Sequence, residues 1–263
     1  MQPLERMSRD ARSRIRGVLT DIDDTLTDHG KLPAAAFGAL ERLQRAGLLV
    51  VPITGRPAGW SDHIARMWPV DAVVGENGAF YMRYDRHARK LLTRFALDAT
   101  TRTQQRARLD AAAERVLARF PGAALASDQP YRLCDLAIDY CEDVPPLAQR
   151  DVDAIVAQLR GDGLTAKVSS IHVNAWLGEY DKCSTSLLML REVCGIGEDA
   201  ARGSFVFVGD SPNDEPMFAA FRNSVGVANI RRFEDALEHR PAYVTRECGA
   251  RGFVELAQWL TSG

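Results

Sequence analysis

Short apolar runs alternate with helical segments along most of this 263-residue chain. The runs that indicate buried strands are at 15–20, 48–53, 72–74, 205–208, 225–228 and 243–244. The segments with helical periodicity that lie between most of them are at 33–46, 58–67, 183–194 and 253–260. This alternation is typical of parallel strands that helices cover on both faces. We therefore expect an α/β fold with a doubly wound, Rossmann-like parallel sheet.

The pattern changes between Asn77 and about Tyr180, where strand and helix signals no longer alternate regularly. The expected elements are a hairpin at 80–84 and 91–95, a long amphipathic helix at 101–120, a half-buried strand at 132–140, a helix at 146–160 and strand character at 164–176. This mixture of strands and helices predicts a smaller α+β domain inserted into the sheet domain. The resulting assignment is a flexible basic tail at 1–14, a core domain at 15–78 and 181–263, and an inserted domain at 79–180.

Polar residues follow three of the predicted core strands at the point where each strand ends. These segments are Asp21-Ile22-Asp23, Thr54-Gly55-Arg56 and Gly209-Asp210-Ser211. Parallel strands place their carboxyl ends at one edge of the sheet, and open α/β sheets bind ligands in the crevice there. We therefore expect the three segments to meet in one site.

Two of the segments are acidic and predict a metal site. Asp21 and Asp23 alternate after the first strand, and Asp214 lies one helical turn beyond Asp210. Like charges about 4 Å apart repel by roughly 4 kcal/mol at an effective dielectric constant of about 20, so four clustered carboxylates need a counter-ion. Oxygen ligands without His or Cys favour a hard divalent cation, and Mg²⁺ fits best.

Two simpler interpretations compete for the segment that begins at Asp21. A calcium loop of the EF-hand type needs Gly at its sixth position and Glu at its twelfth, and these positions hold Leu26 and Leu32. The calcium loop is therefore excluded. A solvated acidic turn without chemical function stays open on this segment alone.

Thr54 and Lys182 supply groups that can bind phosphate. Thr54 ends its strand just before a helix, so its hydroxyl and the neighbouring amides can donate hydrogen bonds to phosphoryl oxygens. Lys182 opens the helix that re-enters the core, and it is one of only four lysines among 33 basic residues. A compact ammonium can approach a phosphate as a point charge in a way that Arg cannot easily replace. The alternatives are a helix N-cap for Thr54 and a solvated surface lysine for Lys182.

Taken in order, these motifs resemble those of the haloacid dehalogenase superfamily of aspartate-nucleophile phosphatases. The matching segments are DIDDTLT at 21–27, ITGRP at 53–57, GENGA at 75–79, DKC at 181–183 and GDSPND at 209–214. The resemblance is to the branch with a large cap inserted after the third strand, the Cof-type and sucrose-phosphatase-like enzymes. It extends from about residue 15 to the end of the chain.

The resemblance implies a role for each matching residue. Asp21 would attack phosphorus and form an aspartyl-phosphate, while Asp23 would protonate the leaving group and then activate water. The implied Mg²⁺ ligands are the Asp21 carboxylate, the Asp23 backbone carbonyl and Asp210, with Asp214 in support. The implied phosphate-binding residues are Thr54, Gly55, Asn213 and Lys182, of which Thr54 and Lys182 also count as catalytic.

The chain departs from the family pattern at two positions. Asp24 stands where many members have Gly, and Cys183 follows the lysine where Gly is common. Neither position performs chemistry in the family, so we expect altered turn geometry at most.

The expected substrate is a small phosphorylated metabolite, and the family suggests a sugar phosphate. The predicted strand at 164–176 places His172, Asn174 and Trp176 on one face, where Trp176 could stack on a sugar and the other two could bind hydroxyls. Arg56, next to the Thr54 motif, is a further candidate substrate residue. The alternative is an exposed strand face with Trp176 packed between the domains.

Two other functions remain to be weighed against a phosphatase. A phosphomutase or phosphotransferase on the same scaffold would pass the phosphoryl group to an acceptor other than water. A response-regulator receiver also gathers acidic residues, Thr and Lys around a phosphorylated Asp, but it spans about half this length and has no inserted domain.

Composition restricts the expected partners. The net charge of −2 gives no positive field to attract nucleic acid or an anionic membrane, and no apolar run is long enough to span a bilayer. Five scattered cysteines without a C-x-x-C pair are typical of reduced thiols in a cytoplasm. We expect a cytoplasmic protein that is a monomer or a weak homodimer.

Overall fold

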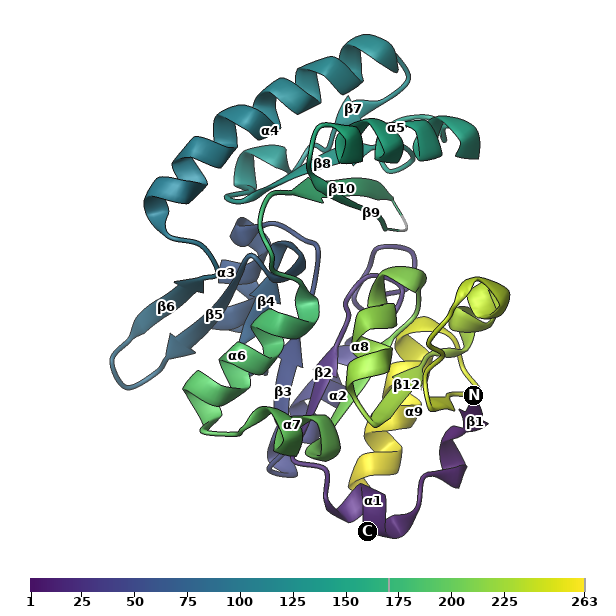
Figure 1. Ribbon diagram of the computed structural model, residues 1–263. Coiled ribbons are helices and arrows are strands. Elements are labelled where there is room, and N and C mark those ends of the chain that lie inside the picture. Colours follow the sequence, from purple (N-terminus) through teal and green to yellow (C-terminus); the bar gives the residue numbers. More distant parts are fainter. Residues whose placement is uncertain (170, 263) are drawn as a thin grey trace.

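The computed structural model describes residues 1–169 and 171–262, and these residues form a six-stranded sheet at the centre of the core. The strand order is β1-β13-β12-β11-β2-β3, and all neighbouring pairs are parallel (Figure 1). The strands are β1 (Gln2–Pro3), β2 (Gly17–Thr20), β3 (Leu49–Pro52), β11 (Phe205–Gly209), β12 (Asn223–Gly226) and β13 (Tyr243–Val244). The predicted α/β class and parallel sheet are confirmed.

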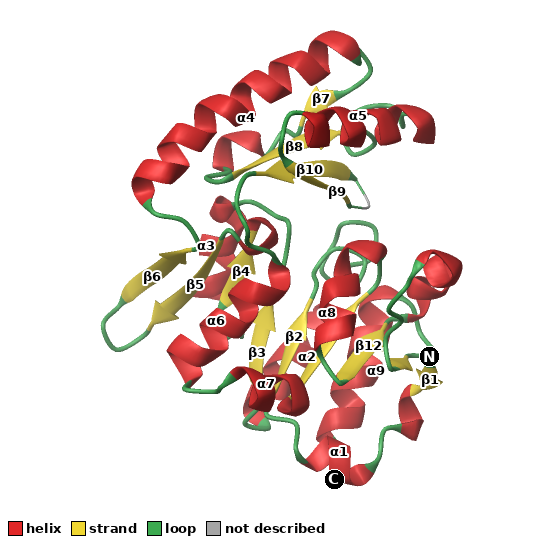
Figure 2. Ribbon diagram, in the orientation of Figure 1, coloured by secondary structure: helices red, strands yellow, loops and turns green. Residues whose placement is uncertain are grey.

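Helices cover both faces of this sheet (Figure 2). One layer contains α2 (Ala34–Arg45), α3 (Ala58–Met67) and α9 (Gly249–Thr261), and the other contains α6 (Lys182–Cys194), α7 (Glu198–Ser204) and α8 (Glu215–Ala220). Val18 of β2 belongs to the hydrophobic cluster of the first layer, and the next residue, Leu19, to that of the second. Consecutive side chains of a strand point to opposite faces, so both must be apolar in a sheet that is covered twice.

The register brings the ends of the three central strands level with one another. Thr20 at the end of β2 pairs with Val208 of β11 on one side and with Pro52 of β3 on the other. The ladder continues one residue further, because the Asp21 N–H donates to the Val208 carbonyl at 2.9 Å and the Ile53 N–H donates to the Thr20 carbonyl at 2.7 Å. The polar segments that follow these strands therefore begin side by side.

A three-stranded sheet extends the core beyond β3. It consists of β4 (Val73–Gly75), β5 (Phe80–Asp85) and β6 (Lys90–Phe95), with antiparallel pairing, and a bridge from Ile53 to Val74 connects it to the central sheet. The hairpin β5–β6 was assigned to the inserted domain from sequence, but it pairs with β4 and its Phe80 lies in the same hydrophobic cluster as Val18. The boundaries of the inserted domain at 79 and 180 stay a prediction.

The inserted part has its own sheet, in the order β7-β8-β10-β9, and we refer to it as the cap. Its strands are β7 (Ala124–Leu125), β8 (Asp135–Asp139), β9 (Thr165–Val168) and β10 (His172–Trp176), all paired antiparallel. Two helices, α4 (Ala99–Arg119) and α5 (Gln149–Gly161), pack on the face of this sheet that is turned away from the core (Figures 1 and 2). The other face of the cap sheet therefore lies over the core.

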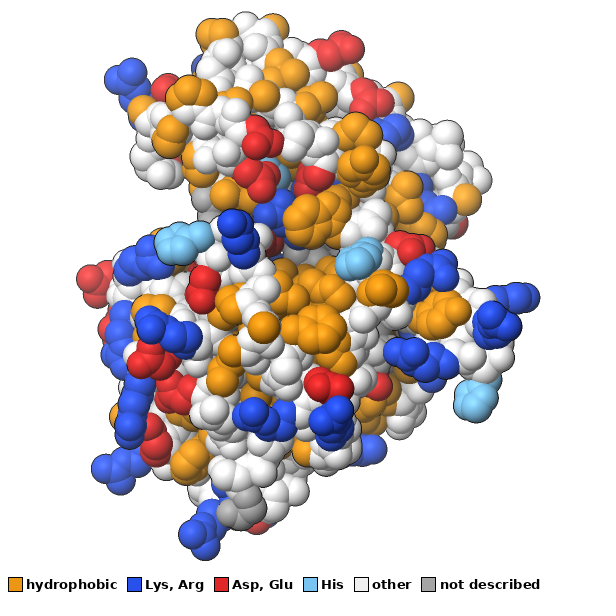
Figure 3. All heavy atoms as spheres, turned by 180° about the vertical axis from the view of Figure 1, so that it is seen from behind, with side chains coloured by type: hydrophobic (Ala, Val, Ile, Leu, Met, Phe, Trp, Pro, Cys, Tyr) orange, Lys and Arg blue, Asp and Glu red, His pale blue; other side chains and the backbone are white. Residues whose placement is uncertain are grey.

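The back of the molecule carries exposed apolar side chains from the first helix layer. Figure 3 shows hydrophobic side chains gathered in the middle of this face. Among the exposed large hydrophobic residues are Phe37 of α2 and Trp60 and Met67 of α3. In the described part of the chain, no helix combines the length and the apolar composition that a membrane span needs.

The N-terminal segment differs from the expected frayed tail. Gln2 and Pro3 pair with β13, and a short helix α1 (Arg9–Ser13) follows. Leu4 and Met7 are buried in the hydrophobic cluster of the first helix layer. The several arginines among residues 1–14 indicate a solvated tail, but the burial of Leu4 and Met7 holds the segment against the core.

Candidate functional site

The three polar segments predicted from the strand ends lie together, as the level register of β11, β2 and β3 requires. Asp21, Asp23, Gly55, Arg56 and Asp210 all line one cavity. Residues of the cap close it from the other side. The cavity volume is about 30 Å³, which is far below the several hundred Å³ typical of ligand pockets. The structure therefore shows the cap and the core close together around the site, with little free volume between them.

Three buried carboxylates form a group that can hold a cation. One carboxylate oxygen from each of Asp21, Asp210 and Asp214 lies within 4.8 Å of the others. The ligand set consists of oxygen atoms alone, which fits a hard divalent ion such as Mg²⁺. The fourth predicted ligand, Asp23, contributes no carboxylate to this group.

Lys182 lies inside the carboxylate group. Its Nζ donates to Asp21 Oδ1 at 2.6 Å and to Asp214 Oδ1 at 2.9 Å, and its side chain is buried. Burial alone would lower the pKa of Lys182, but the two carboxylates outweigh it and raise that pKa. Lys182 is therefore a charged ammonium at the site and not a solvated surface lysine. Asp181, which caps α6 by accepting from the Ser184 N–H, fixes the start of the helix.

One ammonium does not neutralise three carboxylates. Burial is the largest cause that raises the pKa of Asp21 to about 8, and the carboxylates of Asp214 and Asp23 raise it further, while Lys182 lowers it. Burial, Asp214 and Asp21 also raise the pKa of Asp210. A bound divalent cation reverses this effect, because its charge favours the ionised carboxylates. The arrangement is therefore complete only with an added positive charge.

Backbone and amide groups fix the two acidic residues that follow β11. The Asp210 N–H donates to Asp214 Oδ2 at 3.1 Å, so the two side chains are held one turn apart as the spacing predicts. Asn229 Nδ2 donates to Asp210 Oδ2 at 2.9 Å and to the Asp24 carbonyl at 3.1 Å. Sequence reasoning missed Asn229, although it follows the apolar run of β12 in the same way that Asp210 follows β11.

The predicted phosphate-binding residues also surround the cavity. Thr54 is buried, and its Oγ1 accepts from the Arg56 N–H at 2.9 Å, which shapes the turn after β3. A Cβ at Gly55 would come within 3.1 Å of the Asn77 side chain and 3.2 Å of Asn174, so glycine allows both amides to approach the backbone. Asn213 lines the cavity, and its Oδ1 accepts from Ser211 Oγ at 2.5 Å.

Asp23 is held by Arg56 instead of by the acidic group. Arg56 Nε lies 3.1 Å from Asp23 Oδ2, and Nη2 lies 3.0 Å from Asp23 Oδ1. The guanidinium carbon of Arg56 also lies 4.7 Å from the centroid of the Trp60 ring. This two-point contact fixes the Asp23 carboxylate at the side of the cavity that faces the cap.

Two of the three predicted cap residues line the cavity. These two are His172 and Asn174 of β10. Each has a buried polar atom without a hydrogen-bond partner among the described residues, namely Nε2 of His172 and Oδ1 of Asn174. Trp176 is instead fully buried: its ring stacks on Tyr180, and its Nε1 donates to the Tyr180 carbonyl at 3.2 Å. Trp176 thus packs between the domains, where no sugar can stack on it.

The cap supplies a cation that the sequence did not reveal. Arg132 lines the cavity and donates to Asp128, to Asp135 and to the Gly55 carbonyl, at distances from 2.9 to 3.2 Å. Arg132 thus connects the cap directly to the turn after β3.

The buried side chain of Glu76 ties the cap to the core at the same junction. Its Oε1 accepts from the N–H groups of Ala58 and Leu133, and its Oε2 accepts from those of Cys134 and Asp135. The segment that enters β8 is therefore fixed to the core by the backbone. The motif GENGA was noted in the sequence, but only the fold reveals the partners of its Glu.

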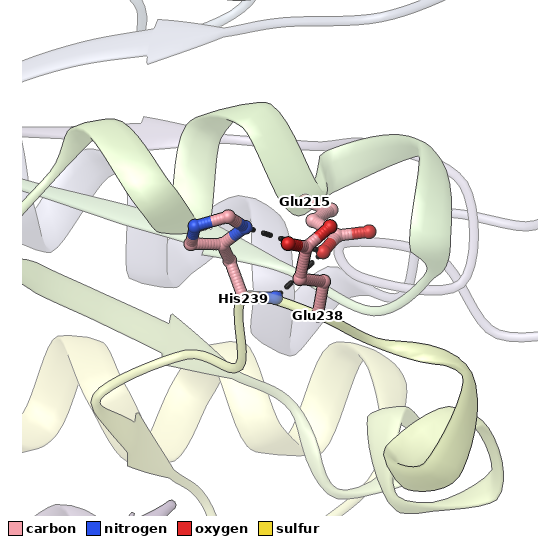
Figure 4. A group of neighbouring side chains, drawn as sticks. All are labelled: Glu215, Glu238 and His239. Atoms are coloured by element: carbon pink, nitrogen blue, oxygen red, sulfur yellow. Dashed lines mark hydrogen bonds and ion pairs between the residues drawn. The ribbon is translucent and has the colours of Figure 1, made fainter.

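A second acidic group lies outside the cavity. Glu215, Glu238 and His239 come together on the core surface (Figure 4). Glu215 Oε1 accepts the His239 N–H at 2.6 Å, so this carboxylate already anchors the loop before β13. Glu238 and His239 are exposed, unlike the three buried carboxylates at the sheet edge.

The fold and sequence of this chain are similar to those of known phosphatases. The family model for haloacid dehalogenase-like hydrolases matches residues 18–104. A phosphoglycolate phosphatase from Methanospirillum hungatei is 25% identical over 249 residues, which cover 92% of this chain and 95% of the relative.

Solved structures show the same fold over the full length. A HAD/COF-like hydrolase from Plasmodium vivax aligns with a TM-score of 0.67 at 17% identity, covering 95% of this chain and 97% of that one. The sucrose-phosphatase from Synechocystis, in complex with sucrose and phosphate, aligns with a TM-score of 0.64 at 16% identity, covering 94% and 98%. The family model over residues 18–104 and the fold shared with these solved structures support a haloacid dehalogenase-like hydrolase with the core and cap of the Cof type.

Proposed function

We propose that this protein hydrolyses a small phosphorylated metabolite, with Mg²⁺, through an aspartyl-phosphate on Asp21. The observation that carries the proposal is the position of Asp21. Its carboxylate lies on the cavity between a charged lysine, 2.6 Å away, and the carboxylates of Asp210 and Asp214. A nucleophile held next to a cation and a metal-binding group is what phosphoryl transfer requires.

In the first step, an Asp21 oxygen attacks phosphorus in line with the bond to the leaving group. Asp23, two residues further on, donates a proton to the leaving oxygen as that bond breaks. In the second step, Asp23 removes a proton from the water that attacks the aspartyl-phosphate. Phosphate is released and Asp21 is regenerated.

The groups around Asp21 have supporting roles in this proposal. Lys182, Thr54, the Gly55 amide and Asn213 would neutralise or hydrogen-bond the equatorial phosphoryl oxygens, where negative charge spreads in the transition state. Asp210, Asp214 and Asp21, with the Asp23 carbonyl, would hold Mg²⁺. The ion would supply positive charge to the transferring group.

Within this class we propose a sugar phosphate as substrate. The support is the buried Oδ1 of Asn174 on β10, which has no hydrogen-bond partner among the described residues, because buried polar groups normally have partners and a hydroxyl can provide one. A neighbouring fold has been solved with sucrose and phosphate, whereas the curated relative is a phosphoglycolate phosphatase. The small closed cavity also favours a small metabolite over a macromolecular substrate.

Release of inorganic phosphate from a panel of sugar phosphates and other phosphate esters tests the proposal. We expect release in Mg²⁺ that EDTA abolishes, with equal amounts of phosphate and dephosphorylated product, since a mutase or transferase would not give that balance. Asp23→Asn should lower kcat on the order of 10²–10⁴-fold. Asp62→Asn, which removes a surface carboxylate paired with Arg66, serves as control. A wild-type protein that hydrolyses no phosphate ester with any divalent ion would overturn the proposal.

A further inference from the structure

We propose that Glu142 makes the leaving-group side of the cavity reject substrates that carry a carboxylate. The inference deepens the proposed function, on which it rests: the enzyme would select phosphate esters of uncharged, hydroxyl-bearing compounds. Glu142 acts through Arg56 and His172, both of which line the cavity, so it is a positioning residue and not a catalytic one.

Glu142 reaches from the cap to two cavity residues. Its Oε1 lies 3.2 Å from Arg56 Nη1, and its Oε2 lies 2.7 Å from His172 Nε2. The two contacts place one negative charge beside two residues that line the cavity.

The backbone holds Glu142 in this position. It lies in the loop after β8, where Asp139 Oδ1 accepts from the N–H groups of Cys141 and Glu142, at 2.9 and 2.8 Å. Asp139 Oδ2 accepts from the Asp143 N–H at 2.8 Å. A loop fixed by one carboxylate in this way presents its side chains in a defined direction.

The positive charges on this side of the cavity are already matched by negative ones. Arg56 contacts Asp23, Glu142 and Asp128, at distances from 3.0 to 3.7 Å. Arg132 contacts Asp128 and Asp135 at 3.0 Å each. Two guanidinium groups therefore face four carboxyl groups, those of Asp23, Asp128, Asp135 and Glu142, and three of these are carboxylates when Asp23 carries the proton that it gives to the leaving group.

The other basic groups of the cap do not change this balance. Burial and the charge of Arg132 lower the pKa of His172, which keeps its imidazole neutral near pH 7. Lys167 of β9 pairs with Asn174 of β10, and burial lowers its pKa; its charged neighbours include the carboxylates of Asp181 and Asp214 in the core. A carboxylate that approaches Arg56 and His172 would thus meet the charge of Glu142, whereas a hydroxyl could donate to Asn174 Oδ1.

Two pairs of substrates that differ only in this charge test the inference. The pairs are 2-hydroxyethyl phosphate with 2-phosphoglycolate, and glucose 6-phosphate with 6-phosphogluconate. For the wild type we expect kcat/KM to favour the uncharged member of the better-used pair by about tenfold or more, mainly through KM. In Glu142→Gln, which has the same shape without the charge, this preference should shrink about tenfold, the effect of one charge several ångströms away.

Two variants separate the charge from the structure of the cap. Glu142→Asp keeps the charge and should retain most of the preference. Asp162→Asn removes a cap carboxylate that pairs with Arg115 at 3.0 Å, away from the cavity, and should leave the preference unchanged. Raising the salt concentration should reduce the preference of the wild type more than that of Glu142→Gln.

The outcomes distinguish this inference from the proposed function. Equal or greater activity of the wild type on carboxylate-bearing esters would overturn the inference while leaving the phosphatase intact. An unchanged preference in Glu142→Gln would overturn it as well. Failure of the wild type to hydrolyse any phosphate ester would overturn the proposed function, and the inference with it.

Discussion

Lys182 in the core and Arg132 in the cap are both buried beside carboxylates, and the two groups differ in what completes them. In the core, Lys182 contacts Asp21 and Asp214, and Asp210 lies within the same group. In the cap, the guanidinium of Arg132 donates hydrogen bonds to Asp128, to Asp135 and to the Gly55 carbonyl. A guanidinium offers five donors in a fixed plane, whereas an ammonium is a point charge.

This difference separates a reactive group from a structural one. The Arg132 group satisfies the hydrogen-bonding geometry of its cation and fastens the cap to the core. The Lys182 group holds three carboxylates against one ammonium, which raises the pKa of Asp21 to about 8. The Arg132 group, whose charges and hydrogen bonds are satisfied, stabilises the fold. The Lys182 group, which has more negative than positive charge, is suited to bind a cation.

The largest expected effect is that of Asp21→Asn on catalysis. Removal of the nucleophile should lower kcat on the order of 10⁴-fold or more. Because it also removes one of the surplus buried carboxylates, the metal-free variant should unfold at a temperature no lower than that of the wild type. Phosphate release and thermal unfolding in EDTA measure the two effects. A clear loss of stability would show that the core group is structural like that of the cap.

Arg132→Ala, in contrast, should lower the free energy of unfolding. It leaves Asp135 buried without its ion-pair partner and Asp128 with only the longer contact to Arg56, and breaking a buried ion pair in this way typically costs about 3–5 kcal/mol of unfolding free energy. Urea unfolding measures this loss. Arg115→Ala, which breaks a more exposed ion pair on the same cap, should cost less than about 1 kcal/mol. Equal effects of the two substitutions would remove the distinction between core and cap.

Metal-free stability should fall as the pH rises from about 4 toward 8. The pKa of Asp21 is about 8 in the folded protein against a usual value of 3.8, so within this range folding takes up a proton and becomes less favourable as protons are removed. Mg²⁺ must displace that proton and should bind more tightly at higher pH. The rise in Tm on adding Mg²⁺ should therefore be larger at pH 7.5 than at pH 5.5. A larger rise at the lower pH would contradict the assignment of Asp21 as a ligand.

The smallest expected effect concerns Asp24, where many family members have Gly. Its φ of 57° lies in the left-handed region, which glycine adopts at less cost than other residues. Asp24→Gly should change the free energy of unfolding by less than about 1 kcal/mol, because relief of strain is offset by greater freedom of the unfolded chain. Chemical denaturation would detect a larger change, which would mean that the Asp24 side chain itself supports the site.

The sequence predicts the core side of the site well because the site residues come directly after the predicted strands. Asp21, Thr54 and Asp210 each come after an apolar run, and parallel strands bring such residues together. Lys182 was conspicuous because lysine is rare in this chain.

The cap side could not be predicted to the same extent. Arg132 is one of many arginines, and its position depends on how β8 docks against the turn at Gly55. Trp176 has the correct alternation for the cavity face, but it ends its strand, and Tyr180 packs against its ring. Contacts between two separately folded sheets leave no local pattern in the sequence.

The chain leaves the core and returns to it at a single point. A Cβ on Gly78 would collide with the carbonyl of Asp181, and Thr185 Oγ1 donates to the Gly78 carbonyl at 2.5 Å. The cap and the β5–β6 hairpin thus lie between two positions that already touch, so the central sheet does not depend on the cap to hold these positions together. Such an attachment allows one cap to be replaced by another while the core and its site are retained.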